Sequence, residues 1–358
     1  MKPRLVVQRG YTLVELMVAL AIGVILIGAV IVVYLIQTQT YKTTNSQAGI
    51  QNAENAIAAL VTPVIRAAGF VGCSNIQQTL TSNLNPGGPP PIGTLATPSM
   101  LFAYDANGTA GTGTLSITQD NPANDSNLTH WTPNLDASLL SQVLPGSDVL
   151  VMFGATPGSQ PVAVTGIGGG GATLTVQDAT GLAAGQFAAV SDCNAATIFQ
   201  ITGVTGSTLA HVAGGNSLDN TAATFVVNVD YQLIPVQQTA IYVAKGSGGQ
   251  SVLTLAIYSG GVWTPSPLVP GVETMQVLYG IGAAGTGAIS QYVPGSSALI
   301  GTNTVYSIRI AFLIEGQPGS ASASNPTQFI VLGTTVNVPQ DTRLRRVYEM
   351  TINLRNAL

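Results

Sequence analysis

The sequence predicts an α+β protein in which one long N-terminal helix packs on a β-rich globular head. An apolar stretch runs from Leu16 to Ile36 without a charged residue. Beyond it, apolar residues recur at three- and four-residue spacing as far as Ile65, which is typical of a helix with one buried face. The remainder is rich in turn residues: the chain has 41 Gly and 20 Pro but only 7% charged residues, which favours many short strands.

Residues 1–10 form a basic leader with Lys2, Arg4 and Arg9 and no acidic residue. The apolar segment that follows, residues 16–36, is about 30 Å long as a helix, the thickness of one hydrocarbon layer. The positive-inside rule keeps the leader cytoplasmic and exports everything after Lys42. We therefore expect a single-pass inner-membrane topology with the N-terminus inside and the C-terminus outside.

A cleaved secretory signal peptide is one alternative, but its apolar core has about 7–15 residues and ends in a small-residue cleavage site. This apolar stretch is longer, and residues 31–36 contain no Ala-x-Ala. A plain single-span anchor is the second alternative. The carboxylate of Glu15 at the start of the span argues against it.

Glu15 needs a cationic partner, because an isolated carboxylate in hydrocarbon costs about 2.5–3.5 kcal/mol. The span contains no Lys or Arg. Cleavage after Gly10 would create an α-amino cation on Tyr11, four residues before Glu15 and on the same helix face. That cation belongs to the same subunit or to a neighbour packed alongside, and the second case makes Glu15 an assembly determinant.

The run from Arg9 through Gly10-Tyr11-Thr12-Leu13-Val14-Glu15 to Gly23 resembles the leader and anchor of type IV pilin-like prepilins. The resemblance implies cleavage after Gly10 by a prepilin peptidase and N-methylation of Tyr11. It also implies pairing of Glu15 with the terminal amine of an adjacent subunit. Tyr11 replaces the commoner Phe. No proline lies between Pro3 and Pro63, so we expect no kink in the span.

The helix is predicted from Thr12 to about Arg66, with Gly69 and Gly72 marking its end. We divide the chain into a leader (1–10), a pilin helix (11–70) and a β-rich head (71–358) with a variable insertion at about 95–240. Runs of β-forming residues separated by turn residues predict the strands of the head. These runs are Met100–Tyr104, Thr114–Thr118, Asp148–Phe153, Ala172–Gln177, Phe187–Val190, Thr197–Thr202, Phe225–Tyr231, Ala240–Ala244, Val252–Tyr258, Met275–Tyr279, Val305–Ile314, Phe329–Thr335 and Tyr348–Leu354.

The two cysteines, Cys73 and Cys193, suggest one disulfide in an exported protein, with two buried thiols as the alternative. Three further segments resemble PilW-like minor pilins: residues 66–73, which end in Cys73, residues 191–193 with 198–202, which include Cys193, and the C-terminal part, where residues 271–280, 345–348 and 354–356 carry the resemblance. The resemblance implies a Cys73–Cys193 bond.

The sequence shows no catalytic, cofactor or metal site, and we expect no enzyme activity. Gly166-Ile167-Gly168-Gly169-Gly170-Gly171 fits a nucleotide-binding pattern, but a strand-forming run follows it where a helix is needed, so we interpret it as a turn. His130 and His211 have no metal-ligand spacing. Residues 68–243 contain no Lys or Arg but nine Asp, which argues against direct nucleic acid binding.

We therefore expect a low-copy structural subunit that moves from the inner membrane into a pilus on the cell surface. By resemblance it would prime assembly at the tip, together with other minor pilins, the major pilin and a PilY-type tip adhesin, and so serve adhesion and twitching motility. Two alternatives remain: a J-type pseudopilin of type II secretion, and a β-rich adhesin or enzyme on a plain membrane anchor.

Overall fold

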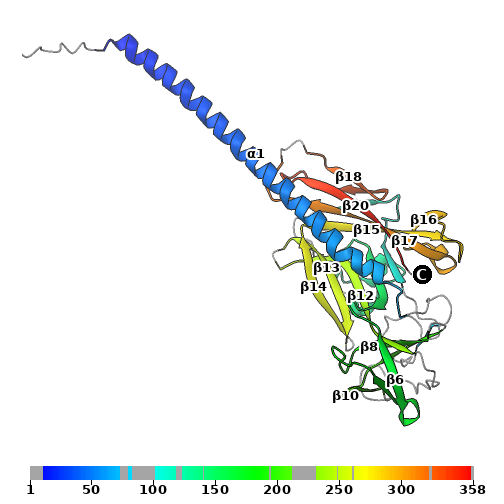
Figure 1. The fold of residues 1–358 in the computed structure, drawn as a ribbon. Helices are drawn as coiled ribbons and strands as arrows, with labels where there is room; N and C mark the ends of the chain where they lie inside the picture. The colour runs from blue at the N-terminus through cyan, green and yellow to red at the C-terminus, as the bar shows by residue number, and fades with distance from the viewer. Residues whose placement is uncertain are drawn as a thin grey trace, which may run out of the picture.

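A computed structural model describes residues 11–72, 80–82, 101–117, 123–139, 141–192, 195–211, 231–247, 249–259, 262–321 and 325–355. One long helix, α1 (Leu13–Ala67), extends far beyond a β-rich head and packs on it with only its C-terminal part (Figure 1). The α+β architecture expected from the sequence is thus confirmed.

Both ends of α1 have local causes. Thr12 caps the N-terminus, and Ala68 has an extended backbone that ends the helix. Gly69 follows with φ 78°, a left-handed conformation that glycine adopts without steric cost. Pro63 lies inside the helix, one turn before this end. The helix begins one residue later and ends one residue later than its sequence predicts.

The C-terminal part of α1 is held by the predicted apolar stripe. Ile50, Ile57, Val61 and Ile65 are fully buried against the head. At about 1.5–3 kcal/mol for each buried aliphatic side chain, these four contribute roughly 6–12 kcal/mol. Leu60, which the three- and four-residue spacing also includes, is 43% exposed. At 100° per residue it lies at the margin of the buried face.

The larger sheet of the head has 13 strands and is mostly antiparallel, with the long strand β12 at its centre. β12 pairs with β8 and β6 near its start and with β5 and β13 further along, so it joins the two halves of the sheet. The strands are β1 Leu80–Ser82, β2 Leu101–Ala106, β4 Trp131–Thr132, β5 Val149–Ala155, β6 Val162–Gly168, β7 Thr173–Val176, β8 Phe187–Ser191, β9 Ala196–Gln200, β10 Gly203–Thr205, β11 Thr208–Ala210, β12 Gln232–Lys245, β13 Ser251–Ser259 and β14 Val262–Pro270.

Two smaller sheets complete the head. One has four antiparallel strands in the order β16-β15-β17-β20, and the other has three in the order β18-β19-β3. Their strands are β3 Thr114–Ser116, β15 Val272–Gly282, β16 Gln291–Pro294, β17 Thr304–Glu315, β18 Gln328–Val331, β19 Thr334–Asn337 and β20 Arg345–Asn353. Short 3₁₀ turns are η1 Leu128–His130, η2 Ala137–Leu139, η3 Gly169–Gly171 and η4 Ala298–Gly301. The buried stripe of α1 shares one core with β15 and β17 of the four-stranded sheet.

Most predicted strand runs contain a strand, and the differences have physical reasons. The sequence pattern did not predict β14, because this strand contains Pro265, Pro267 and Pro270. Among the described strands β14 pairs only with β13, so it is an edge strand, and edge strands tolerate prolines. The run Phe329–Thr335 is a hairpin of β18 and β19 rather than one strand. The run Phe225–Tyr231 falls almost entirely outside the described residues. The turn predicted for the glycine run is present at Gly169–Gly171, between β6 and β7, while residues 166–168 are the end of β6.

Two glycines allow the close approach of α1 to the head. A Cβ on Gly154 of β5 would lie 2.3 Å from the Ala67 carbonyl oxygen, and one on Gly316 would lie 1.9 Å from the Ser46 hydroxyl. Neither position has room for a side chain, because real Cβ contacts of this length do not occur. The sheet and the loop after β17 therefore fit directly against the helix.

Buried charges tie together β15, β17 and β20. Arg345 donates to both Glu273 oxygens at 2.7 and 2.9 Å, and to both Asp341 oxygens at 2.7 and 2.8 Å. Arg343 lies 3.3 Å from Glu315. Three carboxylates thus face two guanidiniums. Burial, together with the charge of Glu273, raises the pKa of Glu315 to about 7.

This cluster predicts a pH dependence. Because the pKa of Glu315 is higher in the folded than in the unfolded chain, its contribution is fully present below about pH 4 and is lost as the pH rises through about 7. Between pH 5 and pH 8 the free energy of unfolding should fall by about 2–3 kcal/mol from this group. Denaturant titration at both pH values should show a smaller fall for Glu315→Gln than for the wild type. Equal falls would contradict the assignment.

A second buried acid joins the two main sheets. The Asp148 carboxylate accepts hydrogen bonds from the Ala106 N–H at 2.9 Å and the Val277 N–H at 2.8 Å, so it connects β2 with β15. Burial and the neighbouring Asp105 raise the pKa of Asp148 well above its ordinary value. Burial also raises the pKa of Asp105, which accepts a hydrogen bond from Ser296.

Candidate assembly site

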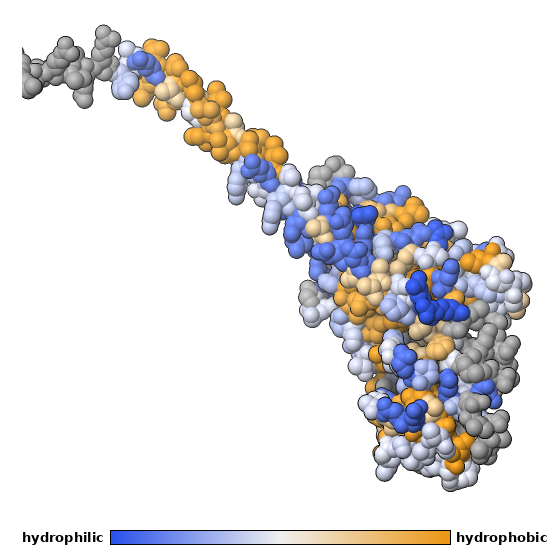
Figure 2. Space-filling model, viewed as in Figure 1, coloured by the Kyte–Doolittle hydropathy of each residue, from blue (hydrophilic) through white to orange (hydrophobic). Residues whose placement is uncertain are grey.

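The apolar part of α1, residues 13–36, has no partner in the part of the head that the structure describes. An 18-residue window of the helix has a mean hydropathy of 3.2, and none of it is buried. Large apolar side chains remain exposed on every face from Leu13 to Ile36. Figure 2 shows this part as a continuous hydrophobic rod that points away from the head. A surface of this kind must be covered by lipid or by other helices.

The Glu15 carboxylate caps its own helix. It accepts hydrogen bonds from the Thr12 N–H at 3.1 Å and the Thr12 hydroxyl at 3.2 Å, while the Glu15 N–H donates to the Thr12 hydroxyl oxygen at 3.2 Å. This reciprocal arrangement is a capping box, which satisfies N–H groups that a helix start leaves open. Glu15 thus has polar partners within its own chain before any second subunit arrives.

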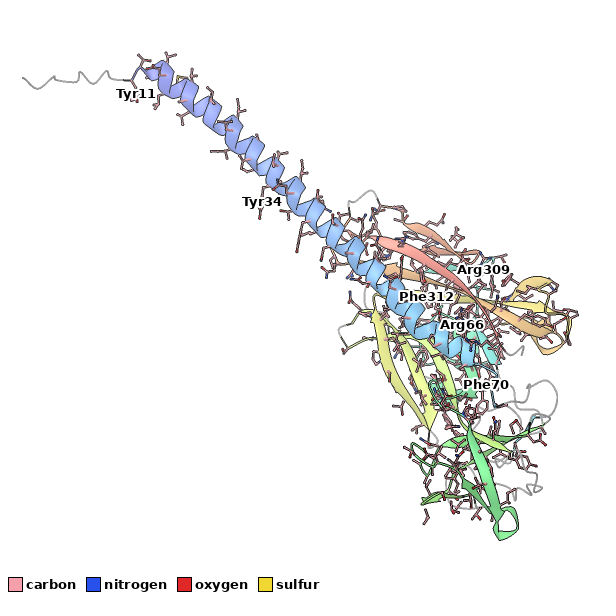
Figure 3. All side chains as sticks on the ribbon, viewed as in Figure 1. Tyr11, Tyr34, Arg66, Phe70, Arg309 and Phe312 are labelled. Atoms are coloured by element: carbon pink, nitrogen blue, oxygen red, sulfur yellow. The ribbon has the colours of Figure 1, made fainter. Side chains whose placement is uncertain are left out.

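Tyr11 precedes this cap and is 92% exposed, at the far end of α1 from the head (Figure 3). Gly10, the predicted residue before the cleavage point, lies outside the described residues. The structure therefore places Tyr11, Thr12 and Glu15 together at one free helix end. Among the described residues, this end lies exposed and far from the head.

Cys73 and Cys193 also lie outside the described residues. Their described neighbours do meet: a Cβ on Gly72 would lie 3.0 Å from the Ser191 Cβ. Gly72 follows the end of α1, and Ser191 ends β8. The chain segments that lead into the two cysteines are therefore in contact.

Polar contacts set the direction in which α1 leaves the head. Gln39 and Thr43 donate side-chain hydrogen bonds to the carbonyl oxygens of Gly319 and Ser320, at 3.2 and 2.8 Å. Further along the helix, Glu54 forms an ion pair of 3.1 Å with Arg346 of β20. The loop after β17 and the last strand therefore hold the middle of α1 from one side.

The two tryptophans and the two histidines make structural contacts within the head. Trp131 and Trp263 are buried, and their ring N–H groups donate to the Ser147 carbonyl oxygen and the Ser138 hydroxyl. His211 is buried beside Phe199, and burial lowers its pKa. His130 bonds Asp125 at 2.6 Å in an exposed turn. Within the described residues, no three potential metal ligands gather.

Sequence reasoning missed the part played by Thr12, although Thr12-x-x-Glu15 is the pattern of a capping box and was readable. It also missed that Arg66 and Arg355 line the same groove at the end of α1. Their meeting had no local sign, because the two residues come from opposite ends of the chain.

Two protein-family models match the chain, one near each end. Residues 7–31 match the prokaryotic N-terminal methylation motif, and residues 240–356 match the family of the type IV pilus-assembly protein W. No curated protein and no solved structure matches the chain. The PilW-like segments at 66–73 and 191–202 lie outside both matched ranges.

The two matches agree with the geometry. The methylation motif covers the cap and most of the exposed apolar part of α1, and the PilW match covers the sheet on which the helix packs. Both families are structural components of pili, and a pilus-assembly family suggests interaction with other pilins and the pilus machinery. The two matches therefore support a PilW-like prepilin-type pilin, a minor pilin related to type IV pili, and the apolar helix fits a membrane anchor.

Proposed function

We propose that this chain is cleaved after Gly10 and then acts as a low-copy subunit of the pilus tip, where it primes assembly. In the membrane it spans once, with its N-terminus inside and its head outside. In the filament its apolar helix half packs among other pilin helices, and its head contacts other minor pilins and a PilY-type adhesin. Its part is structural rather than enzymatic.

The observation that carries this proposal is the exposed apolar half of α1 with a carboxylate at its start. A rod of this composition is stable in lipid and in a bundle of like helices, and the transfer between the two leaves its apolar surface dry throughout. Glu15 distinguishes it from a plain anchor. The α-amine created at Tyr11 would offer the charge that the carboxylate lacks in the uncleaved chain.

Leader removal is the direct test. Purified full-length chain in detergent should lose residues 1–10 when it is incubated with prepilin peptidase, and its intact mass should fall accordingly. The intact mass of protein purified from cells should show the same loss together with methylation of Tyr11. Gly10→Trp blocks access to the peptide bond and should keep the leader. Mature protein that retains Met1 and still enters pili would refute the proposal, and recovery with a type II secretion filament instead would favour the pseudopilin alternative.

The contact of Gly72 with Ser191 supports a Cys73–Cys193 disulfide. The loop it would close has about 120 residues, so the bond should stabilise the head by about 4–5 kcal/mol, less any strain. Mature protein unfolded without reductant should bind no thiol reagent, and reduction should add 2 Da to the intact mass. Cys73→Ser should leave Cys193 open to alkylation. Two reactive thiols in unreduced mature protein would contradict the bond.

A further inference from the structure

A groove of about 690 Å³ lies where α1 ends, between its last turns and the turn after β5. Ala59, Pro63 and Phe70 line one wall and Pro157 the other. Arg66 and Arg355 also line it. We call this the Arg66–Arg355 groove. Figure 3 places Arg66 and Phe70 beside each other at this end of the helix.

The walls of the groove are fixed to each other. The Gly69 N–H donates to the Phe153 carbonyl oxygen at 2.8 Å, and the Ala155 N–H donates to the Phe70 carbonyl oxygen at 2.7 Å. The backbone after α1 thus forms hydrogen bonds along one edge of β5. A groove held in this way needs little rearrangement to accept an occupant, which lowers the cost of binding.

The charge of the groove is positive and unbalanced. Arg66 and Arg355 are both exposed, and neither forms an ion pair with any residue that the structure describes. The other described arginines, Arg309, Arg343, Arg345 and Arg346, each have a carboxylate partner. Guanidinium groups bind carboxylates through paired, planar hydrogen bonds, so the two free ones favour an acidic occupant.

A backbone hydrogen-bond acceptor also favours an acidic peptide as the occupant. Pro63 has no N–H, so the carbonyl group of Ala59, four residues before it, lacks its regular helical donor. Ala59 and Pro63 both line the groove. A carbonyl group without its regular helical donor, on a residue that lines the same groove as two guanidiniums, suits a chain that offers both an N–H and a carboxylate, as an acidic peptide does. A small inorganic anion offers no such donor and leaves most of the volume unfilled.

The position of the groove excludes lipid of the anchoring membrane. About 30 helical residues separate Ile36 from Arg66, which places the groove roughly 45 Å from the apolar half of α1. In the filament that we propose, the heads of neighbouring subunits lie at this level.

We propose that the Arg66–Arg355 groove binds an acidic peptide segment of a neighbouring pilus subunit, whose carboxylate pairs with the two arginines while its apolar side chains rest on Ala59 and Phe70. This proposal rests on the proposed function, because it places the chain beside other subunits. It adds which surface of the head meets them and what chemistry that surface selects.

The test uses the full chain in its native host. A photoreactive residue introduced as Ser159→p-benzoylphenylalanine, at the wall of the groove, should cross-link to one partner subunit. Mass spectrometry should find Asp or Glu within a few residues of the linked position. In the double variant Arg66→Gln/Arg355→Gln the yield should fall about fivefold or more, because charge-assisted hydrogen bonds are lost. Arg309→Gln, an exposed arginine on β17, should leave the yield unchanged.

Three outcomes would overturn the proposal: a linked peptide without an acidic residue, a link to a second copy of this chain, or a yield no greater than from Thr165→p-benzoylphenylalanine at an exposed site of β6. An unchanged yield in the double arginine variant would do the same. The amount of each variant in sheared pili, measured alongside, separates failure of the groove proposal from failure of the proposed pilin function. Wild-type amounts of subunit without the cross-link refute the groove and leave the pilin function standing.

Discussion

Glu15→Ala is expected to lower the amount of this chain in sheared pili at least tenfold, while the membrane fraction keeps the protein. The carboxylate is the only charge in the apolar half of α1. In the bundle of helices that we propose, it neutralises the terminal amine of a neighbour. Removing one member of a charge pair in an apolar environment costs about 3–5 kcal/mol, enough for a loss of this size. Quantitative immunoblotting of both fractions measures the effect.

The capping box offers a matched control. Glu15→Gln keeps an oxygen that accepts the Thr12 N–H, since glutamine also serves at this position of a capping box, but it carries no charge. Thr12→Ala removes the hydroxyl of the cap and keeps the carboxylate. If charge pairing drives incorporation, Glu15→Gln should be as defective as Glu15→Ala, and Thr12→Ala should be milder. Normal incorporation of Glu15→Gln would instead limit Glu15 to capping its own helix.

Arg345→Ala should destabilise the head by about 3–5 kcal/mol, because it leaves buried carboxylates without their partner. Arg345 is buried and holds Glu273 and Asp341 with four short hydrogen bonds. Without Arg345, only the guanidinium of Arg343 in this cluster remains beside the three carboxylates of Glu273, Glu315 and Asp341. Chemical denaturation of the full chain in detergent, followed by the fluorescence of the two buried tryptophans, measures the free energy of unfolding.

Arg309→Ala is the control for this substitution. Arg309 pairs with Glu349 across β17 and β20, but both side chains are more than a third exposed. Exposed pairs contribute about 0–1 kcal/mol, so the variant should unfold close to the wild type. Arg345→Met tests the charge separately from the packing, since it restores much of the stem. If Arg345→Ala cost no more than Arg309→Ala, the buried cluster would contribute nothing to stability.

Local sequence patterns predicted much of the fold. The 3.6-residue period between Ile50 and Ile65 marked the face of α1 that packs on the head, and runs of β-branched residues marked most strands. The pattern failed where a strand broke the usual composition. The prolines of β14 hid an edge strand. The 14 residues of β12, nearly three times the length of the predicted Ala240–Ala244, depend on partners on both sides.

The sequence by itself predicted the leader and determined the span, the charge at the start of the span and the helix stripe, because each depends on residues within a few turns of one another. Only the tertiary structure decided that Arg66 and Arg355 share a groove, that Asp148 bridges β2 and β15, and that Arg345 collects two carboxylates. These contacts join residues far apart in the chain. Their geometry follows from sheet register and helix docking, which no local spacing encodes.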